Sequence, residues 1–164
     1  MLQPNKILVI RFSSLGDLIL TSPIFRELRR IFPGANLNLL TSVGFGDVLD
    51  NNPHLDRIIK HPRKENFEQL NQLIEELQAE DFDLIYDAHR SMRSRWIVSR
   101  LTAFGMKRKP AVWKINKRTL NRKLLIHLGW NRLQQGLSQR EQWLLPLKQH
   151  CLLYTSDAAD DDAC

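Results

Sequence analysis

One apolar run near the N-terminus, residues 6–12 (KILVIRF), constrains the fold more than any other feature of the sequence. Its continuous, β-branched character predicts a strand that is buried on both faces, as in parallel sheets. Further strands are predicted at residues 37–41, 57–60, 82–87 and about 108–113. The first strand is therefore expected to lie within a parallel sheet.

Amphipathic helices are predicted between these strands. Ser22-Pro23 is typical of a helix start, and Pro33-Gly34 of a helix end. Between them, apolar residues follow the spacing of one helix face: Ile24, Phe25, Leu28, Ile31 and Phe32. Other helical segments are predicted at 45–49, 67–80 and 91–104, with Gly105 as a stop, and with a weaker signal at 120–128 and 139–149. This alternation predicts an α/β fold, a Rossmann-like parallel sheet with flanking helices.

Composition and charge narrow the class of protein. Of the 164 residues, 43% are hydrophobic and 26% charged, which is typical of a globular chain. The net charge of +6 favours an anionic partner: nucleic acid, a phosphorylated small molecule or an acidic membrane surface. No apolar run is long enough for a membrane span, and the N-terminus lacks the pattern of a signal peptide. We therefore expect a cytoplasmic protein.

The last fourteen residues, 151–164 (CLLYTSDAADDDAC), differ from the rest of the chain. They hold four of the 18 acidic residues and both cysteines, Cys151 and Cys164, but no Lys or Arg. One reading is an acidic, frayed C-terminus. However, residues 151–161 resemble the translation of an adapter used to build sequencing libraries, so we interpret 151–164 as a non-native, disordered tail. Without it, 24 basic residues face 14 acidic ones, a net charge of +10 for residues 1–150.

The first candidate site is Ser13-Ser14-Leu15-Gly16-Asp17, directly after the first strand. In open α/β sheets, ligands bind at the carboxyl ends of the strands. Here Ser13, Ser14 and Gly16 offer hydroxyls and close backbone approach at a helix N-terminus, although the segment is neither a dinucleotide turn nor a P-loop. Asp17 is either a first-turn acid, which stabilises a helix by about 0.3–1 kcal/mol, or a general base. The local sequence alone favours the first role.

A second candidate site follows the strand at 82–87, in the segment Asp87 to Arg95 (DAHRSMRSR). Its arginines are either solvated on a capped helix or capture an anion, and Arg93 is a stronger candidate for capture than Arg90 or Arg95. A third cluster is a solvated face or a contact for nucleic acid or anionic lipid: Lys107, Arg108, Lys109, Lys114, Lys117, Arg118, Arg122 and Lys123. The histidines are dispersed, and no metal or cofactor is implied.

Two blocks of sequence resemble one family. Residues 6–23 (KILVIRFSSLGDLILTSP) are similar to the opening of the ADP-heptose:lipopolysaccharide heptosyltransferases, family 9 of the glycosyltransferases. Residues 82–89 (FDLIYDAH), followed by 92–95 (MRSR), resemble the second signature of their N-terminal domain. The resemblance covers roughly residues 5–130. It implies a GT-B architecture, in which two Rossmann-like domains face each other across a cleft and residues 1–150 form the N-terminal, acceptor-side domain.

The resemblance also implies roles for the candidate residues. Asp17 becomes the general base of an inverting transfer of heptose, with ADP-heptose as donor and the lipid-linked lipopolysaccharide core as acceptor. Ser13, Ser14 and Gly16 would line the cleft, and His89 and Arg93 would meet anionic groups of the acceptor. Peripheral contact with the anionic inner membrane is expected, and nucleic-acid binding is not.

Two further expectations follow from the length of the chain. Because the donor-binding domain is absent, we expect this polypeptide alone to have little or no transferase activity. Trp130 and Trp143 are expected to be exposed where that domain would pack. The alternative function is a stand-alone α/β module that binds nucleic acid or anionic lipid through its basic face.

Overall fold

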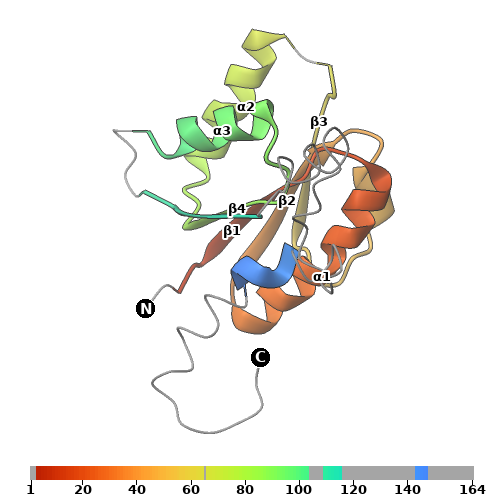
Figure 1. Ribbon diagram of the computed structural model, residues 1–164. Helices are drawn as coiled ribbons and strands as arrows, with labels where there is room; N and C mark the ends of the chain where they lie inside the picture. Colours follow the sequence, from red (N-terminus) through yellow and green to blue (C-terminus); the bar gives the residue numbers. More distant parts are fainter. Residues whose placement is uncertain (1–2, 65, 104–108, 116–142, 148–164) are drawn as a thin grey trace, which may run out of the picture.

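Figure 1 shows the computed structural model, which describes residues 3–64, 66–103, 109–115 and 143–147. Five parallel strands form one sheet in the order β3-β2-β1-β4-β5. Their bounds are β1 Lys6–Ile10, β2 Asn36–Ser42, β3 Arg57–His61, β4 Leu84–Asp87 and β5 Ala111–Lys114. The predicted α/β fold with a parallel sheet is confirmed. The apolar run near the N-terminus forms β1, the central strand of the sheet.

Helices cover both faces of this sheet (Figure 1). They are α1 Leu15–Ile31, the 3-10 helix η1 Gly46–Leu49, α2 Phe67–Ala79 and α3 Met92–Leu101. Successive side chains of a strand point to opposite faces, so β1 contributes Ile7 and Val9 to the layer under α1 and Leu8 and Ile10 to the layer under α2 and α3. This two-sided burial explains why the strands read as continuous apolar runs.

Helix α1 begins at Leu15, so the predicted start at Ser22-Pro23 is wrong. Ser14 is the N-cap, and its backbone N–H donates to Asp17 Oδ2 over 3.4 Å. The early helix forms because Leu18 and Thr21 extend the buried face back by two turns. Pro23 lies inside the helix, where it removes the hydrogen bond to the carbonyl of Ile19, a residue that is 52% exposed.

A short helical segment, residues 143–147, packs on the α1 side of the sheet and confirms part of the helix predicted at 139–149. Trp143 is only 6% exposed, so the expectation of an exposed interface position is wrong there. Its ring is buried because β1, β4 and α1 leave an apolar layer that this segment completes. Several predictions concern residues outside the described ranges: Gly105, Trp130, the helix at 120–128 and the tail 151–164. Helix α3 ends at Leu101, three residues before its predicted end.

Candidate functional site

The two predicted site segments lie together at the carboxyl edge of the sheet. Strands β1 and β4 are parallel neighbours, with Ile10 in register with Asp87. The residues that follow them, 11–17 and 88–93, therefore emerge side by side. Arg11 Nη1 donates to the carbonyl of Ala88, which ties the two segments to each other.

Asp17 has the first-turn position that the sequence predicts for it, and its predicted role as general base stays a prediction. It stands in the first turn of α1, where Oδ2 accepts the N–H of Ser14. The same oxygen is 2.5 Å from Nη2 of Arg11. The carboxylate is about one-third exposed, and within the described ranges Oδ1 accepts no hydrogen bond. Asp17 is therefore a carboxylate that Arg11 and Ser14 hold through one oxygen, Oδ2.

Arg11 is the site residue that the sequence reasoning missed. Its side chain is only 3% exposed, which is rare for arginine unless the charge is paired. Burial lowers the pKa of Arg11, while the negative charges of Asp17 and Asp87 oppose this shift. Because the ordinary pKa of arginine is so high, the group stays protonated. The available signal was a lone cation that follows the buried strand and precedes the serine turn.

Ser13, Ser14 and Gly16 form the exposed rim of this edge. Ser13 is half-buried, and Ser14 and Gly16 are exposed. A Cβ added to Gly16 would meet no atom within 4 Å. The fold therefore has room for a larger side chain at this position. A glycine here would instead allow a ligand to approach the backbone closely.

His89 and Arg93 meet at Phe12, the residue that follows Arg11. The His89 ring packs edge-on against Phe12, with 5.8 Å between the ring centroids. The Arg93 guanidinium carbon lies 4.0 Å from the Phe12 centroid, and its Nη2 donates to the carbonyl of Pro62 over 2.9 Å. Both predicted residues thus lie at the same edge as Asp17. Their predicted contact with an anion stays a prediction.

Asp87 organises the loop that carries His89. Its Oδ1 accepts the backbone N–H groups of His89 and Arg90 over 3.0 and 2.7 Å, and its Oδ2 accepts the Ser94 hydroxyl over 3.2 Å. This clamp stabilises Arg90 at a φ of 50°, a left-handed conformation that is uncommon outside glycine. Asp87 is only 1% exposed, so its role is to shape the loop from beneath.

The other predicted cations are placed differently. Arg90 and Arg95 line a groove of about 700 Å³ between α3 and β5, together with Trp96 and Lys114. In the third basic cluster, Lys109 and Lys114 are exposed, and its other members lie outside the described ranges.

The described ranges contain neither a metal-binding cluster nor a membrane-spanning helix. No three His, Cys, Asp or Glu side chains gather there closely enough to hold a metal ion. None of the helices in that part of the chain is long and apolar enough to cross a membrane.

The sequence of this chain is similar to those of curated heptosyltransferases. The chain is 28% identical to lipopolysaccharide heptosyltransferase 1 of Pseudomonas aeruginosa over 101 residues, which are 56% of this chain and 28% of that protein. It is also 28% identical to lipopolysaccharide heptosyltransferase 1 of Escherichia coli K12 over 111 residues, 62% of this chain and 34% of that protein. The chain therefore spans about a third of the length of these relatives. No family model matches it.

Solved structures show the same fold. The glycosyl transferase family 9 protein of Veillonella parvula superposes with a TM-score of 0.68 at 19% identity, covering 91% of this chain and 42% of that one. Escherichia coli heptosyltransferase WaaC with ADP-2-deoxy-2-fluoro heptose superposes with a TM-score of 0.60 at 23% identity, covering 87% and 48%. The resemblance predicted from the two sequence blocks is thus confirmed: the chain is similar in sequence and in fold to family 9 heptosyltransferases.

Proposed function

We propose that this chain is the N-terminal, acceptor-side part of an inverting heptosyltransferase, with Asp17 as general base. The observation that carries the proposal is the carboxylate of Asp17, which Arg11 holds through Oδ2 at the carboxyl edge of the sheet, while Oδ1 accepts no hydrogen bond from the described residues. The helix N-terminus and the guanidinium both attract a negative charge. The carboxylate is the form that accepts a proton.

In the proposed reaction, Asp17 takes the proton of an acceptor hydroxyl. The oxygen attacks the anomeric carbon of heptose, and the bond from that carbon to the diphosphate breaks. ADP leaves with the bonding electrons, and attack from the opposite side inverts the anomeric carbon. ADP-heptose is the proposed donor because a solved neighbour carries a fluorinated form of it. The lipopolysaccharide core is the proposed acceptor, and the curated relatives are named lipopolysaccharide heptosyltransferases.

The neighbouring residues receive supporting roles in this proposal. Ser13, Ser14 and Gly16 line the cleft near the sugar and the diphosphate, on the exposed rim beside Asp17. His89 and Arg93, which both pack against Phe12, face anionic groups of the acceptor. A second domain would bind most of the donor, which is in keeping with the greater length of the relatives. We accordingly propose that the polypeptide alone transfers little heptose.

Substitution of Asp17 tests the proposed reaction. In a complete enzyme that contains this chain as its proposed N-terminal part, Asp17→Asn should lower kcat by at least 100-fold, the usual contribution of a general base. Asp47→Asn is the matched control, because Asp47 is also an acid in an ion pair but lies in η1. Near-normal turnover of Asp17→Asn would reduce Asp17 to a helix cap.

We also propose peripheral contact with an anionic membrane, on its cytoplasmic face. Three large apolar side chains are exposed near one another in α2 and α3: Phe67 at 66%, Met92 at 89% and Trp96 at 43%. The rings of Phe67 and Trp96 are 6.3 Å apart, and the exposed cations Arg63 and Lys64 precede α2. Aromatic side chains beside cations suit the interface of an anionic bilayer.

Vesicle binding tests this contact. The chain should sediment with vesicles that contain phosphatidylglycerol and not with pure phosphatidylcholine, and Phe67→Ser with Trp96→Ser should weaken binding by about tenfold or more. Val43→Ser with Val48→Ser is the control, since these exposed apolar residues lie elsewhere. Binding to nucleic acid in place of vesicles would favour the alternative of a stand-alone binding module.

A further inference from the structure

Arg11 lies between the candidate base and a segment far along the chain. Its Nη2 contacts Asp17, its Nη1 contacts the carbonyl of Ala88, and its guanidinium carbon is 4.8 Å from the centroid of the Trp143 ring. Arg11 and Trp143 are 3% and 6% exposed. Water therefore has little access to this cation, and an aromatic ring takes its place over the guanidinium.

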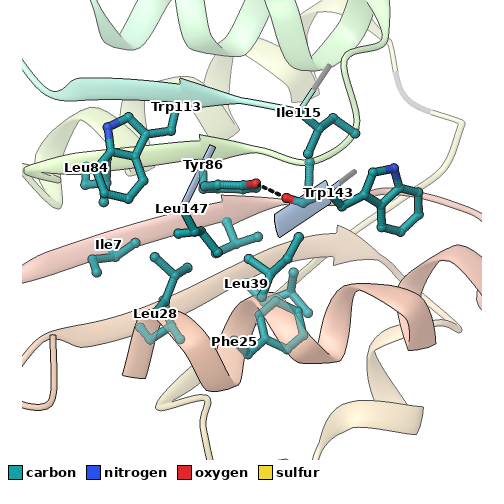
Figure 2. Packing of buried hydrophobic residues seen from close by; sticks show 14 of the residues in the cluster. Ile7, Phe25, Leu28, Leu39, Leu84, Tyr86, Trp113, Ile115, Trp143 and Leu147 are labelled. Atoms are coloured by element: carbon teal, nitrogen blue, oxygen red, sulfur yellow. Dashed lines mark hydrogen bonds between the residues drawn. The ribbon is translucent and has the colours of Figure 1, made fainter. Parts of the chain in front are cut away.

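The segment that carries the Trp143 ring is itself held in place. The hydroxyl of Tyr86, in β4, donates to the carbonyl of Trp143 over 2.6 Å, as Figure 2 shows. Burial raises the pKa of Tyr86, so the hydroxyl keeps its proton and remains a donor. One turn later, Leu147 is 2% exposed in the same apolar layer. Both ends of the segment are thus fixed to the sheet.

The negative charges of two carboxylates favour the protonated form of Arg11, but only one of them, Asp17, is in contact with it. Asp17 lies at the mouth of the site, and the second carboxylate, Asp87, lies at the end of β4. The Arg11 Nε is buried without a hydrogen-bond partner in the described part of the chain, so the guanidinium is held by its two Nη contacts, to Asp17 and Ala88, and by the ring packed over it. A ring packed over it restricts the orientations in which it can reach Asp17.

We infer that Trp143 is a positioning residue for the candidate base. Its ring holds the Arg11 guanidinium against Asp17. Residues 143–147 thereby position the Asp17 carboxylate, although the two segments are far apart in the sequence. The inference rests on the proposed role of Asp17. It assigns a function to a segment that no sequence motif marked.

A spectroscopic experiment on this chain tests the contact independently of activity. In ¹⁵N NMR, the Arg11 guanidinium should show resonances shifted by the ring current and slow rotation about its bonds. Trp143→Leu should remove the shift and average the Nη signals, whereas Trp143→Phe should retain both. Trp113→Leu is the control, because Trp113 is a similarly buried tryptophan of the same core that packs near Phe32. An unchanged Arg11 spectrum in Trp143→Leu would overturn the inference.

Kinetics of the complete enzyme test the consequence. Trp143→Leu should lower kcat by about tenfold or more, with KM for both substrates changed less than twofold, because a misplaced base slows the chemical step. Trp143→Phe should restore most of kcat. If Trp143→Leu does not fold, Tyr86→Phe loosens the same segment without loss of volume and should lower kcat in the same direction. A normal kcat in the folded variant overturns the positioning role, while normal turnover of Asp17→Asn overturns the proposed function itself.

Discussion

At Gly16, folding and the proposed function make different demands. The position lies in the first turn of α1, and an added Cβ meets open space. Gly16→Ala should therefore leave the chain as stable or raise its free energy of unfolding by up to about 1 kcal/mol, since alanine favours the helix. In the complete enzyme it should raise KM by about tenfold, because the methyl group would block a ligand at the backbone. Thermal unfolding and steady-state kinetics measure the two effects, and an unchanged KM would remove Gly16 from the site.

The residues of the site differ in how far sequence could predict them. Asp17 stands three residues after Ser14 in a capping pattern directly after a strand, so its place at the sheet edge followed from local sequence. The burial of Arg11 could not be predicted in this way. It depends on Trp143, which is distant from Arg11 in the sequence and contacts it only in the folded chain. Asp87 was visible as a residue, but its function as a loop clamp depends on three hydrogen bonds in space.

At the scale of elements, Asp56 links α1, β2 and the turn before β3. Its Oδ2 accepts the N–H of Leu37 and a hydrogen bond from Arg29 Nη2, both over 2.6 Å. Desolvation works against the charged form, but these hydrogen bonds and the charge of Arg29 outweigh it and lower the pKa of Asp56. A carboxyl group whose pKa is lowered by folding stabilises the fold above its unfolded pKa, about 3.9, and loses this contribution as pH falls through the folded value.

Asp56→Asn should therefore lower the free energy of unfolding by about 0.5–1 kcal/mol at pH 7, a modest effect because Asp56 is partly exposed. The difference from the wild type should shrink as the pH falls below about 4. Denaturant unfolding at several pH values measures it. Asp50→Asn is the control, since the Asp50 carboxylate pairs with Lys60 and, among the described residues, accepts no backbone N–H from a strand. A difference that persists unchanged at low pH would show that charge is not the cause.

The elements themselves were predictable where periodicity was strong. Strands β1 and β4 and helix α2 follow from apolar runs or from one-sided helical spacing. The start of α1 could not be predicted in this way, because two local signals compete. Ser22-Pro23 resembles a helix start, but the capping pattern at Ser14 and the burial of Leu18 decide the outcome. Burial is a property of the assembled layers, and it overrides the local preference of proline.

At the scale of the whole molecule, the α1 side of the sheet is closed by a segment from the far end of the domain. Leu147 is buried at 2%, whereas Leu144 is only partly buried against the same cluster. If residues 143–147 are part of the cooperative core, Leu147→Ala should lower the free energy of unfolding by about 2–4 kcal/mol, and Leu144→Ala by clearly less.

The unfolding curves of this pair also test whether the fold is one unit. Destabilisation by Leu147→Ala should shift the unfolding of β1 and β4 along with the segment, because Ile7, Val9 and Tyr86 share its apolar layer. Hydrogen exchange of the central strands should therefore accelerate in Leu147→Ala under conditions where global unfolding limits exchange. Unchanged exchange in β1, with faster exchange confined to residues 143–147, would mean that the segment docks on an independently stable sheet. Arg11 would then be held by an element that can detach from the candidate base while the rest of the domain stays folded.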